Sequence, residues 1–168
     1  MFKRILVAID GSLAAAQGLE CAIELAADQH ATLYVVHVIN DALVAPNLGG
    51  GLVPAEYFEG MIESLRATGR ELIGTAKALA RKRGLEANAL VVEMYGRSVA
   101  ETILAQANKR KADVIVLGTH GRRGLRRLVL GSDAEAVLHE SAVPVLLVRG
   151  PEQVNPDTRP ARRGGRPW

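Results

Sequence analysis

Glycine and arginine residues are concentrated in one segment, which runs from Gly118 to Asp133 with the sequence GTHGRRGLRRLVLGSD. It follows the short apolar run VIVL and holds four glycines and four arginines. Glycines let backbone N–H groups approach an anion with no side chain in the way. Ser132 is predicted to begin a helix, whose first N–H groups and partial positive charge also favour an anion. The order of these residues therefore suggests a loop that binds phosphate.

The same segment also has a purely structural interpretation. The letters SDAE from Ser132 to Glu135 match a capping box, in which the serine hydroxyl and the glutamate carboxylate bond each other's backbone N–H groups. Asp133 and Glu135 would then satisfy the helix dipole and repel a phosphate. The four arginines neutralise phosphates in the first interpretation and only solvate an exposed loop in the second. Neither a Walker loop nor a dinucleotide fingerprint is present, so the residues alone leave both interpretations open.

A second polar candidate is Asp10, in the stretch AIDGS at the end of the first predicted strand. A carboxylate there can accept hydrogen bonds from a ribose or from the edge of an adenine. The alternative is that Asp10 or Ser12 only caps the first helix.

Catalytic and metal-binding patterns give no comparable signal. Four histidines lack metal-ligand spacing with one another or with the single cysteine: His30, His37, His120 and His139, with Cys21. No nucleophile–base pair is evident either. We therefore expect no metal-ligating residues and no dedicated catalytic residues.

Five short apolar runs predict the strands that position these candidates: Ile5–Ile9, Thr32–Val38, Ala89–Tyr95, Val114–Leu117 and Val143–Val148. Continuous apolar runs are typical of strands buried on both faces. Apolar residues at helical spacing predict four helices between the strands: Ser12–Gln29, Ala55–Arg83, Ser98–Lys109 and one from Ser132 to before Pro144. The alternation implies an open, doubly wound, five-stranded parallel sheet with helices on both faces. Asp10 and Gly118 then share the carboxyl edge, where ligands of such sheets bind.

Charge and composition limit the classes of partner. The net charge is +3, of which Gly150–Trp168 contributes +2 through four arginines against Glu152 and Asp157. The remaining +1 leaves the body nearly neutral, which does not favour nucleic-acid binding. No apolar run approaches the roughly 20 residues that span a bilayer, and the first apolar run is too short for a signal peptide. We expect a cytoplasmic protein without a membrane partner.

Two segments depart from the alternation of strands and helices. Residues 40–54, NDALVAPNLGGGLVP, follow the second strand and are either a lid over the carboxyl edge or a tolerated insertion. Residues 150–168 are rich in proline and arginine and are predicted to be a disordered tail, with residues 1–149 forming the domain.

These residues resemble the universal stress protein family. Its mark is G-x2-G-x9-G-[ST], which is matched here by Gly118, Gly121, Gly131 and Ser132. The opening KRILVAIDGS, the second-strand run LYVVHV and the closing VPVLLVR match in kind and order. The resemblance covers the chain from about Phe2 to Arg149 and implies a Rossmann-like fold of the adenine nucleotide alpha hydrolase type, with a homodimer formed through Val143–Val148.

The resemblance also implies ATP binding, because members that keep the glycine motif bind ATP. Carried over by position, Asp10 holds the adenosine, while the backbone around Ala8 and Val38 lines the adenine pocket beside Leu117. The phosphates are held by Gly118, Gly121, Gly131 and Ser132. Arg122 and Asp133 complete the predicted set, and Mg²⁺ or Mn²⁺ is expected with the ATP.

Two positions depart from the family pattern. Asp133 stands where a small or apolar residue is usual, and its charge opposes phosphate unless a cation or the arginines offset it. Ala8 replaces a proline of some ATP-binding members. The sequence thus predicts a homodimeric, ATP-binding regulator of a stress response. The alternatives are a slow ATP hydrolase and a dimeric interaction protein that binds no nucleotide but contacts another protein.

Overall fold

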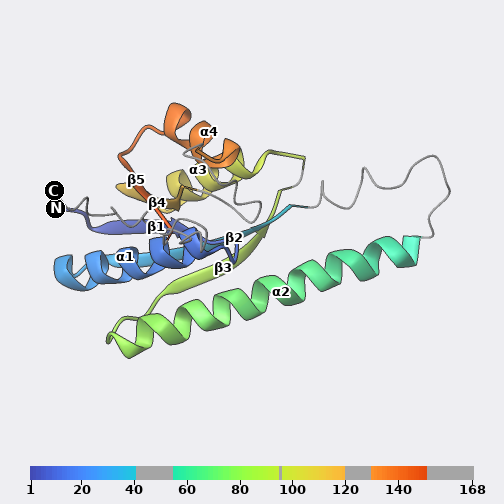
Figure 1. Cartoon of the computed structure of the whole chain (residues 1–168), viewed down its shortest axis with the longest axis horizontal. Helices are drawn as coiled ribbons and strands as arrows, with labels where there is room; N and C mark the ends of the chain where they lie inside the picture. Colours follow the sequence, from blue (N-terminus) through green and yellow to red (C-terminus); the bar gives the residue numbers. More distant parts are fainter. Residues whose placement is uncertain (41–54, 95, 120–129, 151–168) are drawn as a thin grey trace, which may run out of the picture.

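The fold is seen in a computed structural model that describes residues 1–40, 55–94, 96–119 and 130–150. Five strands form one parallel sheet in the order β3-β2-β1-β4-β5. Their bounds are β1 (Arg4–Ala8), β2 (Thr32–Ile39), β3 (Asn88–Glu93), β4 (Val114–Gly118) and β5 (Val145–Val148). Figure 1 shows the sheet between its covering helices. The predicted fold class, an open, doubly wound parallel sheet, is confirmed.

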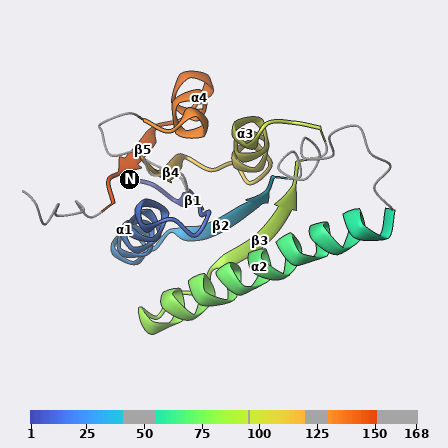
Figure 2. The same ribbon diagram turned by 45° about the vertical axis from the view of Figure 1, so that its right-hand side comes forward.

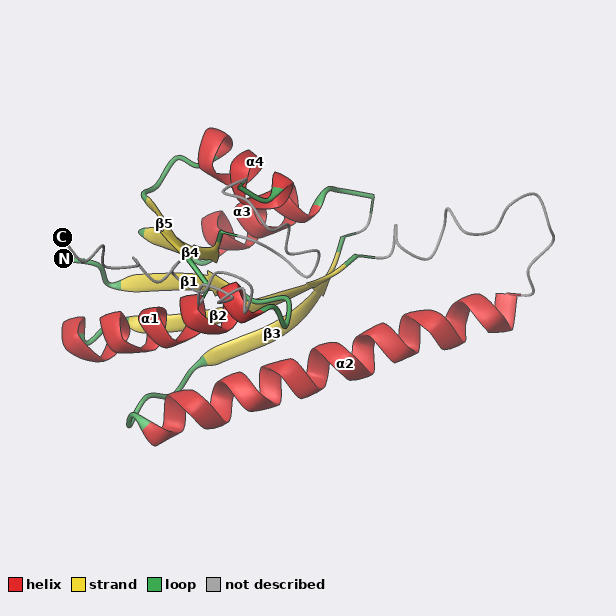
Figure 3. Ribbon diagram, in the orientation of Figure 1, coloured by secondary structure: helices red, strands yellow, loops and turns green. Residues whose placement is uncertain are grey.

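Four helices connect the strands: α1 (Leu13–Gln29), α2 (Ala55–Lys82), α3 (Val99–Lys109) and α4 (Ser132–Glu140). Figures 2 and 3 show α1 and α2 on one side of the sheet and α3 and α4 on the other. None of the helices in the described part of the chain is long and apolar enough to cross a membrane.

Burial on both faces explains the continuous apolar runs of the central strands. Ile5, Leu6 and Val7 of β1 are all fully buried. Ile5 and Val7 belong to the apolar cluster that includes α1 and α2, whereas Leu6 belongs to the cluster of α3 and α4. Successive side chains of a strand point to opposite faces, so a strand covered on both sides needs an apolar residue at every position.

The strand order places a topological switch point between β1 and β4. From β1 the chain crosses to β2 on one side, while β4 pairs with β1 on the other side. The connections that follow β1 and β4 therefore diverge to opposite faces at the carboxyl ends of these two strands. Ligands of open α/β sheets bind in the crevice that such a divergence leaves.

Strand ends differ from their predicted bounds by one or two residues. The last strand begins at Val145 rather than Val143. The Ser141 hydroxyl accepts from the Val143 N–H at 3.2 Å and donates to the Val143 carbonyl at 2.7 Å. These bonds keep Val143 in a turn, and Pro144, which has no N–H, follows it.

Candidate functional site

Three segments that are distant in the sequence meet at the crevice between β1 and β4. The Gly131 N–H donates to the Thr119 carbonyl at 2.9 Å, which ties the start of α4 to the end of β4. Gly118 in turn packs against Ala14 in the first turn of α1. The structure therefore brings the start of α1, the end of β4 and the start of α4 together, as the predicted site requires.

Asp10 shapes the turn that leads from β1 into α1. Its Oδ1 accepts a hydrogen bond from the Ser12 N–H at 2.9 Å, and Gly11 between them has a φ of 84°. Ser12 is the N-cap of α1, with its hydroxyl accepting from the Ala15 N–H at 3.1 Å. The structural alternative for Ser12 is thus confirmed. A carboxylate has about four acceptor positions, so the bond to Ser12 is compatible with a ligand bond at Asp10.

Gly118 is required by helix packing. A Cβ at Gly118 would lie 2.6 Å from the Ala14 carbonyl carbon and 2.7 Å from the Ala15 nitrogen. Real Cβ atoms essentially never approach backbone so closely, so α1 fits against β4 only where the side chain is absent. The motif spacing explains this glycine by the approach of an anion. The structure adds a packing reason that no spacing in the sequence reveals.

The predicted capping box at the start of α4 is wrong. Gly131 is the N-cap, at φ −63° and ψ 142°, and no side chain bonds at this cap. Ser132 is instead the first helical residue. Asp133 and Glu135 do lie in the first turn, as expected. The first N–H groups of a helix have no acceptor within it, so this helix start keeps the backbone geometry that favours an anion.

A true capping box occurs at α3. The Ser98 hydroxyl accepts from the Glu101 N–H at 3.1 Å, and the Glu101 carboxylate accepts from the Ser98 N–H at 2.6 Å. These bonds lower the pKa of Glu101, chiefly through the backbone N–H of Ser98. The two helix starts therefore differ: α3 has a side-chain capping box, and α4 has no side-chain cap.

The three predicted adenine-pocket residues share one face of the sheet. Ala8, Val38 and Leu117 all belong to the apolar cluster on the side of α3 and α4. Leu6 and Val36, two residues before Ala8 and Val38, are fully buried, whereas Ala8 and Val38 are only half-buried. Apolar surface is thus left partly uncovered at the carboxyl edge, beside the switch point. A flat apolar group such as a base could cover it.

Several predicted residues lie outside the described part of the chain. Gly121 and Arg122 of the expected ATP set are among them, as is His120. The same holds for residues 41–54, the suggested lid or insertion, and for residues 151–168 of the suggested tail.

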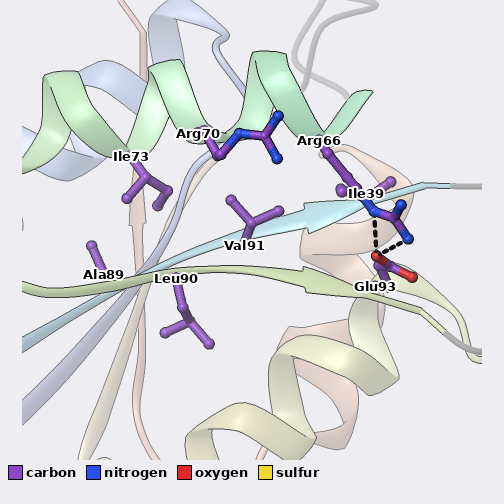
Figure 4. A pocket seen from close by; sticks show the side chains of 8 residues that line it. All are labelled: Ile39, Arg66, Arg70, Ile73, Ala89, Leu90, Val91 and Glu93. Carbon is purple, nitrogen blue, oxygen red and sulfur yellow. Dashed lines mark hydrogen bonds and ion pairs between the residues drawn. The ribbon is translucent and has the colours of Figure 1, made fainter. Parts of the chain in front are cut away.

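A hollow of about 400 Å³ lies between α2 and the β2–β3 edge of the sheet, away from the predicted set. Figure 4 shows its apolar lining, with Ile73 on α2 and with Ile39, Ala89, Leu90 and Val91 on the strands, and the ion pair of Arg66 with Glu93 at one end. No motif in the sequence points to this hollow. A charged pair that joins a helix to a strand far along the chain leaves no local pattern in the sequence.

Ion pairs fix the polar rim of this hollow. Arg66 lies 2.7 Å from Glu93 and 3.5 Å from Glu63, and Arg70 lies 2.6 Å from Glu63. The hydrogen bond from Arg70 lowers the pKa of Glu63, and the bond to Glu93 raises the pKa of Arg66. Both shifts favour the charged forms of Glu63 and Arg66. No group of three or more potential metal ligands occurs among residues the structure describes.

The strand order and the covering helices define a doubly wound α/β protein. Residues 1–149 match the model of the universal stress protein family, and the chain belongs to that family. It is 33% identical over 151 residues to universal stress protein YxiE of Bacillus subtilis, covering 89% of this chain and 100% of the relative. Universal stress protein A homolog 1 of Coxiella burnetii is 37% identical over 150 residues, covering 88% and 96%.

Solved structures agree with this assignment. A universal stress protein family member from Burkholderia pseudomallei is 33% identical, with a TM-score of 0.67 and coverage of 87% of this chain and 95% of that one. The universal stress protein from Archaeoglobus fulgidus in complex with dAMP is 27% identical, with a TM-score of 0.59 and coverage of 87% and 97%.

The two helix starts predict different changes in the free energy of unfolding when a serine is replaced. Ser98→Ala removes an observed cap and should lower the free energy of unfolding by about 1 kcal/mol. Ser132→Ala removes no cap bond and should change it by less than about 0.5 kcal/mol. Urea unfolding of both variants measures the difference. A loss at Ser132 equal to that at Ser98 would restore the capping box at α4.

The packing at Gly118 is tested by adding one methyl group. Gly118→Ala should lower the free energy of unfolding by about 1–3 kcal/mol, because the methyl group meets the backbone of α1. The matched control is Gly74→Ala in α2, where a Cβ meets nothing within 4 Å. The control should gain up to about 1 kcal/mol through helix propensity. A Gly118→Ala variant as stable as the parent in thermal unfolding would contradict the observed packing.

Proposed function

We propose that this protein is a homodimeric, ATP-binding regulator of a stress response, with ATP in the crevice between β1 and β4. The observation that carries the proposal is the meeting of Asp10, the end of β4 and the start of α4 at the topological switch point. Binding of ATP is proposed to change the populations of two states of the protein, which a partner then distinguishes.

The chemistry of the crevice suits the parts of the nucleotide. The adenine would cover the partly exposed apolar surface at Ala8 and Val38, with Leu117 behind it. Asp10, which follows β1 at the same edge, would accept from the ribose hydroxyls. The partly exposed apolar surface thus suits the base, and the carboxylate suits the sugar.

The phosphates would lie against the start of α4. Gly131 and Ser132 begin this helix without a side-chain cap, so its first backbone N–H groups and its dipole can face an anion. The Gly131 N–H itself donates to Thr119, so the donors proposed for the phosphates are those that follow it. The motif spacing adds Gly118, Gly121 and Arg122 to the proposed set.

The acidic first turn of α4 requires a counter-charge. Asp133 and Glu135 both lie in this turn, and their carboxylates repel a polyphosphate by ordinary electrostatics. We propose that Mg²⁺ or Mn²⁺ bound with the ATP, together with Arg122, offsets this repulsion. Phosphate groups supply most of the ligands of Mg²⁺ in nucleotide sites, so few protein ligands are needed.

The comparisons support an adenine nucleotide as the class of ligand. The Archaeoglobus fulgidus relative was solved in complex with dAMP and is aligned over 87% of this chain. A ligand of that kind fits the apolar edge and the carboxylate described above. The relative holds a monophosphate, whereas we propose a triphosphate for this chain. The proposal of a triphosphate rests on the glycine motif.

Nucleotide binding is tested by calorimetric titration with ATP and Mg²⁺, after analysis of any nucleotide released from the denatured purified protein. Asp10→Ala should weaken binding about tenfold, because about 1.4 kcal/mol corresponds to the loss of one good hydrogen bond. Asp28→Ala, an exposed carboxylate at the far end of α1, is the control and should bind as the parent does. No bound nucleotide and no heat with the parent would rule the proposal out. Steady phosphate release that Asp10→Ala abolishes would favour the slow hydrolase instead.

The proposed dimer pairs through β5, which lies at one edge of the sheet. An edge strand offers unpaired backbone groups to a second chain, and Leu146 on β5 is 37% exposed. A second copy would cover both the backbone groups and this side chain. Two-fold pairing of the same strand gives a closed, self-complementary interface.

The interface is tested by light scattering coupled to size-exclusion chromatography. Leu146→Glu should convert a dimer to a monomer, because two equal charges would meet across the two-fold axis. Tyr57→Glu is the control, since Tyr57 is 61% exposed on α2 at a distance from β5 and should leave the dimer intact. A parent that is monomeric, or a Leu146→Glu variant that remains dimeric, would exclude pairing through β5.

A further inference from the structure

His37 is a buried polar side chain for which the proposed site has no role so far. It is 5% exposed, and within the described ranges its only companion among buried polar or charged residues is Thr102. Thr102 donates to the Ser98 carbonyl at 2.8 Å and thus belongs to the start of α3. His37 lies on β2, one residue before Val38, and belongs to no helix cap. Burial of an imidazole costs free energy unless it is hydrogen-bonded.

The His37 ring reaches across to the end of β1. Its Nδ1 lies 2.8 Å from the carbonyl oxygen of Ile9. A carbonyl oxygen only accepts, so Nδ1 carries the hydrogen and donates. The Ile9 N–H is also engaged, donating to the Val36 carbonyl at 2.9 Å. Both backbone groups of Ile9 are therefore held by β2, one of them through the imidazole.

Helix α2 holds the ring in this position. A Cβ at Gly69 would lie 2.8 Å from His37 Cδ2 and 3.1 Å from a methyl carbon of Val91. The absence of a side chain at Gly69 therefore allows α2 to rest directly on the imidazole. The ring is confined between the backbone of α2 on one side and the Ile9 carbonyl on the other, which fixes its orientation.

The Ile9 carbonyl belongs to the peptide bond that leads into Asp10. Because a peptide unit is planar, a hydrogen bond that fixes its carbonyl oxygen also fixes the direction in which the chain enters Asp10. Asp10 then accepts from the Ser12 N–H, and Ser12 caps α1. A continuous set of contacts thus runs from α2 through His37 to the Asp10 carboxylate.

We propose that His37 is a positioning residue of the nucleotide site, which holds the Ile9–Asp10 peptide so that the Asp10 carboxylate meets the ribose. This inference rests on the proposed function, but its structural half does not require ATP. A residue that only fills the core would act through its volume. A positioning residue acts through the donor at Nδ1, and the two roles are separable by substitution.

The test compares two amides that differ in the place of their donor. His37→Asn puts its nitrogen at the position of Nδ1, whereas His37→Gln puts it near the position of Nε2. Asn should therefore keep the bond to Ile9, and Gln should lose it. Thr102→Val is the control, because it removes a buried polar bond in α3, on the opposite face of the sheet.

The first readout is hydrogen exchange at the Ser12 amide, which donates to Asp10. His37→Gln should raise the exchange rate about tenfold, the factor for one lost hydrogen bond. His37→Asn and Thr102→Val should leave it near the parent rate. Equal rates in the Asn and Gln variants would overturn the inference. If the Gln variant does not fold while the Asn variant does, the requirement for a donor at Nδ1 is supported.

The second readout is the affinity for ATP with Mg²⁺. His37→Gln should weaken binding about tenfold, His37→Asn should restore most of it, and Thr102→Val should not alter it. Unchanged affinity in the Gln variant would exclude the positioning role in binding. A parent that binds no ATP would refute the proposed function, while the exchange rate of Ser12 would still decide whether His37 holds Asp10.

Discussion

Burial of β1 on both faces is the constraint on which the rest of the structure depends. Ile5, Leu6 and Val7 are fully buried between β2 and β4 and between two pairs of helices. A strand in that position must carry apolar residues where it is covered on both faces, so between Arg4 at its start and Asp10 beyond its end it has no polar side chain. The first polar group after β1 thus emerges at the carboxyl edge, where the connections of β1 and β4 diverge. The place of the candidate site follows from the burial of one strand.

The crevice combines features that have separate structural reasons. Ser12 caps α1, and Gly118 makes room for that helix. Asp10 shapes the turn before the cap. None of these features requires a ligand. The same switch point nevertheless also holds a partly uncovered apolar edge and the start of α4, which has no side-chain cap. The chain belongs to the universal stress protein family, one of whose members was solved with dAMP, and this supports the proposal that an adenine nucleotide binds at this edge.

The sequence predicted the architecture well because strand burial and helix periodicity are local patterns. It predicted the edge at which Asp10 and Gly118 lie, since parallel strands share the direction of their ends. It failed where the cause is a tertiary contact. The serine–glutamate spacing at Ser132 matched a cap that Gly131 occupies instead. The packing of Gly118 on Ala14 and of Gly69 on His37 depends on how helices meet the sheet, which no spacing in the sequence encodes.

The most direct test of the central claim is a nuclear magnetic resonance titration of the isotope-labelled protein with ATP and Mg²⁺. If the nucleotide occupies the switch point, the largest amide shifts should occur at the end of β1, at Gly118 and Thr119, and at the first turn of α4. The amides of Arg66, Arg70 and Glu93, around the hollow beneath α2, should move little. Shifts centred on that hollow, or none at saturating ATP, would contradict the account.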